Sequence, residues 1–256
     1  MTQNERLIFL IKYLLNESER YRDIDIPSDI TERKNLFRSL MNIRTPKAIS
    51  DDFIKIQDEY LQGEIAEKGI TDADTLLFAE NKISLWQGDI TTLKCGAIVD
   101  AANSAMLGCF VPCHKCIDNA IHTFSGIELR LECAEIMEKQ GFAEQTGKAK
   151  ITKSYNLPCD YILHTVGPIV GGRLTEKHCT LLASCYNSCL DLAERYGIKS
   201  VAFPCISTGE FHFPNEKAAE IAINTVREKL KTSTVERVIF NVFKDEDKRI
   251  YEKLLG

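Results

Sequence analysis

Three cysteines and one histidine lie within eight residues of the sequence, at Cys109, Cys113, His114 and Cys116. Thiolate and imidazole groups together favour a tetrahedral zinc ion. Cys109, His114 and Cys116 can hold one ion, with Cys113 as the competing ligand, because the neighbours Cys113 and His114 are awkward to use together. Three protein ligands would leave a position open for water or substrate, whereas four would close a structural site. Without a metal, the cysteines would be small apolar side chains.

An aspartate follows this cluster at the start of a predicted helix. Apolar residues recur at helical spacing from Ile117 to Phe124, which places Asp118 in the first turn, where the positive end of a helix stabilises an anion. Asp118 can hold or deprotonate a water, or orient a ribose hydroxyl, with the metal ion polarising the same group. The alternative role for Asp118 is a helix cap. His122, one turn later, is expected to be structural.

A second candidate binding segment runs from Ser207 to Pro214, after a β-rich run. Its small residues and Gly209 let backbone N–H groups approach an anion closely, which would make a diphosphate cradle without a lysine. Phe211 can stack on a sugar or ring face. The alternative is an ordinary turn between strand and helix, in which Asn215 caps the next helix.

Two single polar residues also follow predicted strands. Asp89 can accept a hydrogen bond from the exocyclic amine of a base, or it can cap a turn. Asn103 can orient a ribose hydroxyl, or it can satisfy backbone groups at a strand end.

The composition limits the class of protein. The 256 residues are 44% hydrophobic, enough for one large or two small domains, and the net charge of -5 argues against non-specific nucleic-acid binding. No stretch reaches the roughly 18 to 20 apolar residues of a membrane span, and the N-terminal segment has no signal-peptide cleavage site. In such an unsecreted chain, long enough to pack without disulfides, the ten cysteines are not expected to form a disulfide framework, because reducing compartments keep thiols free. We expect a cytoplasmic protein with no nucleic-acid or membrane partner.

The elements that must position these residues fall into two parts. The first seventy or so residues show helical stripes around Leu10, Leu40 and Tyr60, separated by Pro27 and Pro46. From Ile83 onward, β-rich runs alternate with helical ones, which is typical of an α/β domain. The β-rich runs are 83–90, 97–103, 161–166, 200–205 and 237–243, and further helices are expected at 182–196, closed by Gly197, at 218–230 and at 245–255.

In a mostly parallel sheet, the ligand site lies at the carboxyl ends of the strands. The segments that follow the predicted strands should therefore carry function, and they contain the candidates described above. None of these segments is a Walker A loop or a GxGxxG fingerprint, which argues against an ordinary nucleoside triphosphatase or dehydrogenase.

Taken together, five motifs resemble the macrodomain family of ADP-ribose-binding proteins. The motifs are QGDIT at 87–91, AIVDAAN at 97–103, IDNAIH at 117–122, ILHTVGP at 162–168 and ISTGEFHFP at 206–214. They occur in the family's order and spacing. The resemblance implies an α/β fold: a macrodomain over residues 72–256, with three α/β/α layers and a mixed central sheet, preceded by a helical N-terminal extension, residues 1–71, packed on the domain.

The resemblance also implies which residues bind ADP-ribose. Asp89 with Ile90 would hold the adenine, Asn103 would contact the distal ribose, and the segment from Ser207 would wrap the diphosphate and the distal ribose. The implied contacts are Asp89, Ile90, Asn103, Cys116, Ile117, Asp118, Ser207, Thr208, Gly209, Glu210 and Phe211. Asp118 matches the aspartate assigned to catalysis in MacroD-type hydrolases, and Asn103 is the second catalytic candidate. His212 stands where many relatives have glycine, which affects the expected distal-ribose geometry but not the fold.

One departure from the common pattern is the run GCFVPCHKC at 108–116, where most MacroD-like members are glycine-rich. It resembles the zinc-containing macrodomains of Gram-positive bacteria and fungi, whose ligands map onto Cys109, His114 and Cys116 with one zinc ion per chain. In bacteria these proteins are encoded beside a class M sirtuin and a lipoyl-carrier protein. They remove ADP-ribose from a modified acidic side chain, so the resemblance implies a zinc-dependent protein-ADP-ribose hydrolase.

The implied reaction is of glycosidase type, with water attacking C1'' of the distal ribose and ADP-ribose as the product. Two other functions fit the same motifs: an ADP-ribose-binding reader with a structural zinc, and an O-acetyl-ADP-ribose deacetylase. A third possibility is an interaction protein in which residues 1–67 dock a partner. An open metal site beside Asp118 would favour the hydrolase.

Overall fold

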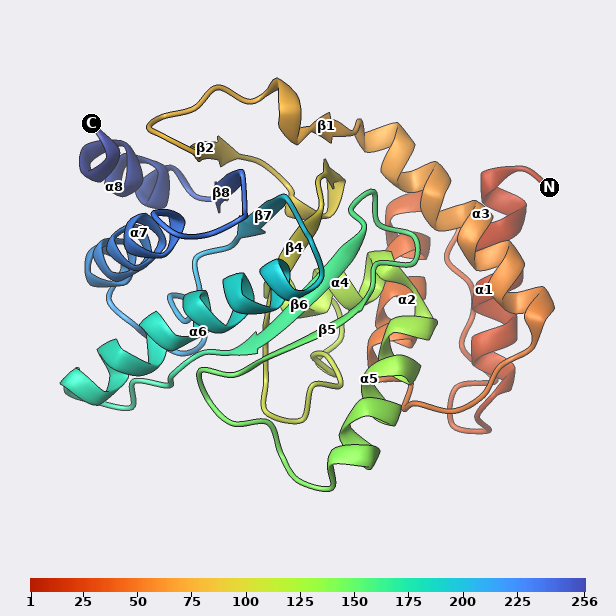
Figure 1. The fold of residues 1–256 in the computed structure, drawn as a ribbon. Coiled ribbons are helices and arrows are strands. Elements are labelled where there is room, and N and C mark those ends of the chain that lie inside the picture. Colours follow the sequence, from red (N-terminus) through yellow and green to blue (C-terminus); the bar gives the residue numbers. More distant parts are fainter.

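A computed structural model describes residues 1–256 and confirms the α/β architecture, with a six-stranded sheet between layers of helices (Figure 1). The strands of this sheet are β2 (Ile83–Gln87), β4 (Ala97–Ala102), β5 (Ala149–Lys153), β6 (Tyr161–Val166), β7 (Ser200–Phe203) and β8 (Arg237–Val242). Their order is β2-β8-β7-β4-β6-β5, and only β5 runs antiparallel to its neighbour. The central sheet is therefore mixed, as expected. A separate pair joins β1 (Thr71–Asp72) to β3 (Leu93–Lys94).

Alternate residues of each strand face opposite helical layers, as the two-residue period of a strand requires. Val99 of β4 and Phe240 of β8 pack with α6 (Glu176–Arg195), α7 (Asn215–Leu230) and α8 (Asp245–Leu255). Ile98 and Ile239 face the other way, toward α4 (Ile117–Ser125) and α5 (Ile127–Gln140). Asp100, two residues after Ile98, therefore points toward the layer that contains α4.

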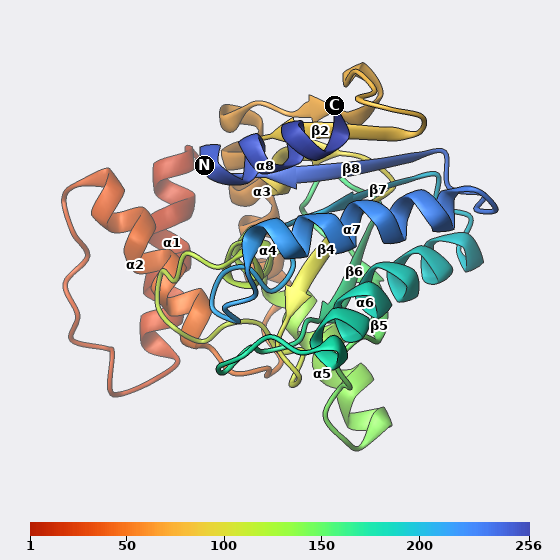
Figure 2. The same ribbon diagram turned by 90° about the vertical axis from the view of Figure 1, so that its left-hand side faces the viewer.

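The N-terminal region is helical, with α1 (Gln3–Asn16), α2 (Ile30–Ile43) and α3 (Asp51–Lys68). These helices share an apolar core that also includes Phe124 and Ile127, so they cover the outer side of α4 and α5. Figure 2 shows α1 and α2 on the side of the molecule away from α6. No helix combines the length and the apolar character needed to cross a membrane. The domain boundary between residues 71 and 72 stays a prediction.

Several elements differ from the expectations. The helix α5 and the strand β5 were not anticipated, although Gly126 and Gly141, both with positive φ, bound α5 and signal its ends. The expectation that Asn215 caps α7 is wrong. Pro214 occupies the cap position and Asn215 is the first helical residue, and its side chain donates to Asp247 Oδ1 of α8 at 2.7 Å.

Candidate active site

The metal loop, residues 103–116, joins β4 to α4 and carries the three predicted ligands. The ligand atoms of Cys109, His114 and Cys116 lie within 4.8 Å of one another. His114 Nδ1 is buried and has no hydrogen-bond partner. Burial, reinforced by the nearby Cys109 and Asp118, raises the pKa of the Cys116 thiol to about 12, so this thiol keeps its proton unless a cation displaces it. Two sulfurs and one imidazole at this spacing fit a zinc ion.

Cys113, the competing ligand, is turned away from this group. Its φ of 52° is in the left-handed region, which reverses the chain between Pro112 and His114. The Cys113 thiol donates to Asn35 O at 3.3 Å and lies 3.2 Å from Ser39 Oγ, both on α2. The structure therefore brings three of the four candidate ligands together, which leaves room for water or substrate at a bound ion.

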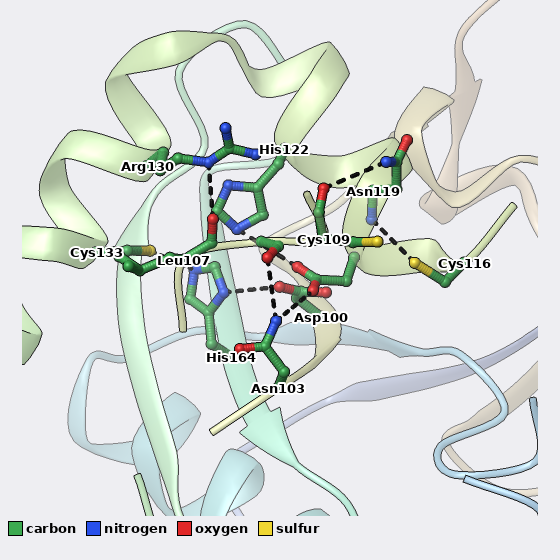
Figure 3. Close-up of polar contacts among 12 residues, drawn as sticks. Asp100, Asn103, Leu107, Cys109, Cys116, Asn119, His122, Arg130, Cys133 and His164 are labelled. Atoms are coloured by element: carbon green, nitrogen blue, oxygen red, sulfur yellow. Dashed lines mark hydrogen bonds and ion pairs between the residues drawn. The ribbon is translucent and has the colours of Figure 1, made fainter. Parts of the chain in front are cut away.

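The two predicted catalytic residues meet beside the metal loop. Asp118 lies in the first turn of α4, as expected, and Cys116 is the residue that caps this helix through its sulfur. Asn103 Nδ2 donates to Asp118 Oδ2 at 3.1 Å and to Gly108 O at 3.1 Å. Asn103 thus fixes both the carboxylate of Asp118 and the backbone of the metal loop at Gly108. Figure 3 shows Asn103 beside Asp100, with Cys109 and Cys116 on the side of Asn119.

A buried polar network that the sequence analysis missed lies behind Asp118. The register of β4 and β6 pairs Asp100 with His164, and Asp100 Oδ2 lies 2.9 Å from His164 Nδ1. Burial raises the pKa of Asp100 to about 7, and burial together with Asp100 raises the pKa of Asp118 well above its usual range. The available signal was a charged or polar residue inside an otherwise apolar strand, in AIVDAA and YILHTV.

Two further groups with metal-ligating atoms belong to this network. They are Asp100, Asp118 and His122, and His122, Cys133 and His164. His122 is buried, neither of its ring nitrogens has a hydrogen-bond partner, and its Nε2 lies 3.5 Å from Asp118 Oδ1; its structural role stays a prediction. These groups lack the open, half-buried position of the metal loop, so we regard Cys109, His114 and Cys116 as the candidate metal site.

The raised pKa of Asp100 predicts a pH-dependent stability difference. Between its ordinary pKa of 3.8 and its folded value of about 7, folded Asp100 holds a proton that the unfolded chain has lost. Because the folded state binds more protons in this window, Asp100 lowers the unfolding free energy of the native protein as the pH rises through it.

Asp100→Asn removes this titration and keeps an oxygen for His164. The unfolding free energy of Asp100→Asn minus that of the native protein should increase from about pH 4 to about pH 7 and then level off. Urea unfolding of both proteins across this range measures the difference, and a difference independent of pH would contradict the assignment.

The candidate diphosphate loop, residues 207–211, follows β7 at the same end of the sheet. The amide N–H groups of Ser207, Gly209, Glu210 and Phe211 donate to no backbone or side-chain acceptor in the structure, so they are available to an anion. Ser207 has a φ of 67°, and its buried Oγ has no partner. These features fit a cradle better than an ordinary turn.

A second loop fixes this cradle from one side. Val170 N–H donates to Phe211 O at 2.8 Å. A Cβ at Gly167 would lie 2.1 Å from Ser207 Oγ and 2.9 Å from Ile206 Cγ2, so any larger residue at 167 would have to displace these side chains.

The metal loop and the diphosphate loop are neighbours in space. Glu210 Oε1 lies 3.6 Å from His114 Nε2, although the two residues belong to segments that follow different strands. A ligand with a diphosphate in one loop would therefore place its adjoining sugar near the candidate metal site.

The structure also places the predicted adenine contacts. Asp89 caps a 3₁₀ turn, η2 (Ile90–Thr92), by accepting from Thr91, and its second oxygen pairs with Lys68 of α3 at 3.0 Å. The turn-capping role is thus present, and a role in binding adenine stays a prediction. Ile90 is only 1% exposed, so its predicted contact with adenine also stays a prediction.

Comparisons with known proteins agree with this arrangement. A family model described as Macro domain matches residues 99–222. The chain is 55% identical over 261 residues to a protein-ADP-ribose hydrolase of Treponema medium, with 100% of both chains covered. It is 47% identical over 250 residues to a protein-ADP-ribose hydrolase of Staphylococcus aureus strain MSSA476, covering 95% of this chain and 94% of that relative. A solved Trypanosoma brucei macrodomain in complex with ADP-ribose has a TM-score of 0.66 at 30% identity, covering 86% of this chain and 95% of that one. The chain belongs to the macrodomain family.

Proposed function

We propose that this protein is a zinc-dependent hydrolase that removes mono-ADP-ribose from acidic side chains of a modified protein. One observation carries the proposal: the group of Cys109, His114 and Cys116 adjoins both the Asn103–Asp118 pair, through Asn103 and Gly108, and the diphosphate loop, through His114 and Glu210. The names of the Treponema and Staphylococcus relatives, which align with nearly the whole chain, support the same activity.

The bond that breaks joins C1'' of the distal ribose to a side-chain oxygen of Asp or Glu. Water supplies the oxygen that replaces it at C1'', and the freed side chain leaves as the carboxylate with a proton released. The amide groups of residues 207–211 hold the diphosphate, Asn103 orients the distal ribose, and Asp118 orients the water or accepts its proton. Zinc held by Cys109, His114 and Cys116 would polarise the ribose hydroxyl or water beside Asp118.

We also propose which protein carries the ADP-ribose and in which compartment this enzyme works. The substrate we propose is a lipoyl-carrier protein, on the resemblance of the metal loop to that of zinc-containing macrodomains. All ten cysteines carry free thiols, which a reducing compartment such as the cytoplasm maintains.

The test is release of ADP-ribose from a protein modified on Asp or Glu, followed by mass spectrometry of both products. Matched samples contain the zinc-loaded, the chelator-stripped and the zinc-restored protein. We expect release to vanish on stripping and to return with zinc. Binding of ADP-ribose without release in any sample would make the protein a reader with a structural ion. Turnover of O-acetyl-ADP-ribose alone would make it a deacetylase.

A further inference from the structure

The metal loop depends on other elements for its shape. It contains no helix or strand between Asn103 and Cys116, so few of its backbone groups are paired by regular structure. Backbone N–H and C=O groups in such a loop need partners from side chains or water. Two of these partners, Arg38 and Asn42, come from α2, a helix of the N-terminal region.

One face of α2 is polar and points toward the metal loop. Its residues recur at helical spacing, and they are Asn35, Arg38, Ser39 and Asn42. The opposite face carries Phe37, Leu40 and Met41, which are buried among α1 and α3. Asn42 is only 1% exposed although it is polar, and a buried amide of this kind needs hydrogen-bond partners.

Arg38 connects α2 to the metal loop and to α4. Its guanidinium donates to His114 O at 2.9 Å and to Asn119 Oδ1 at 3.0 and 2.7 Å. Asn119 in turn donates its amide to Cys109 O at 3.4 Å and its backbone N–H to Cys116 Sγ at 3.4 Å. Arg38 and Asn119 together therefore contact all three predicted ligand residues, through the backbone or the sulfur (Figure 3 shows the Asn119 contacts).

Asn42 makes a second connection one turn later on the same helix. Its Oδ1 accepts from Cys113 N–H at 2.9 Å, and its Nδ2 donates to Thr123 Oγ1 of α4 at 3.0 Å. Cys113 N–H and His114 O flank the peptide unit that leads into the ligand His114. Arg38 and Asn42 thus fix the backbone on both sides of this ligand.

We propose that α2 is an integral part of the metal site, with Arg38 and Asn42 as positioning residues that hold the metal loop in its ion-binding geometry. This inference rests on the proposed zinc dependence. A loop already held in place loses less conformational freedom when the ion binds, so the ion binds more tightly. The N-terminal helices then contribute to metal affinity without contacting the ion.

The experiment compares Arg38→Gln and Asn42→Ala with the control Lys34→Ala. Lys34 lies on the same helix but pairs with Glu64 of α3 at 2.7 Å, away from the metal loop. Zinc affinity is measured by competition with a chromophoric chelator, and the absorption spectrum of the Co(II)-loaded protein reports the ligand geometry. Far-UV circular dichroism of each variant establishes that it is folded. Arg38 is half-buried, so Arg38→Gln decides the question if Asn42→Ala does not fold.

We expect both variants to bind zinc about 10- to 100-fold more weakly, with an altered Co(II) spectrum and native circular dichroism. The Lys34→Ala control should retain the zinc affinity and spectrum of the native chain. Zinc affinity and Co(II) spectra unchanged in folded Arg38→Gln would overturn this inference and leave the proposed function standing. A native protein that binds no zinc would overturn both.

Discussion

His114→Ala and Cys116→Ala are each expected to lose bound zinc and ADP-ribose release together. The three ligand atoms lie within 4.8 Å of one another, and no other group of the metal loop can replace a lost one, because the Cys113 thiol contacts α2 instead. With two ligands left, a zinc ion loses much of its binding energy. Metal analysis of the purified variants, together with the release assay, measures both effects.

The matched control is Cys113→Ser in the same loop. Serine keeps a donor for Asn35 O and retains the backbone N–H bound by Asn42, so zinc content and turnover should match the native protein. Native turnover in a metal-free His114→Ala protein would show that zinc has no part in the reaction. Loss of zinc in Cys113→Ser would show that the ion takes Cys113 as a ligand.

Asp118→Ala is expected to lower turnover by about 10²- to 10⁴-fold while zinc stays bound. Its Oδ2 is held by Asn103 at 3.1 Å, beside the metal group, where it can act on the water or the ribose. Asp118 is not among the three ligands of the metal loop, so the ion should remain. Single-turnover release and metal content of the variant separate these two effects.

We expect the Asp118→Ala protein to fold, so that a loss of turnover reports on catalysis. Burial and the neighbouring Asp100 raise the pKa of Asp118, so the carboxyl is costly to ionise in the folded protein and its removal relieves that cost. The control is Asp160→Ala, an exposed carboxylate just before β6, at the opposite end of that strand from the site. Wild-type turnover in Asp118→Ala would exclude a catalytic role for this residue, and loss of zinc would assign it to the metal site.

The sequence alone predicted the features that depend on residues close together in the chain. Strand and helix periodicity predicted the alternation from Ile83 onward and the helices of the N-terminal region. The spacing of Cys109, His114 and Cys116 within one loop predicted their meeting, and Asp118 followed in the first turn of the next helix. Periodicity and the first turn of a helix are set within a few residues, and the short spacing confines the candidate ligands to one loop. The family motifs, which are also short, predicted the fold that the comparisons support.

Only the tertiary structure decided the contacts between distant segments. Arg38 reaches His114 across 76 positions of sequence, Asp100 meets His164 through the register of two strands, and Glu210 approaches His114 from another loop. None of these contacts follows from periodicity, because each depends on how helices pack and how strands pair. The choice among four possible ligands was decided in the same way. The left-handed backbone at Cys113, whose N–H donates a hydrogen bond to Asn42 of α2, turns one thiol away and leaves three ligands at the candidate metal site.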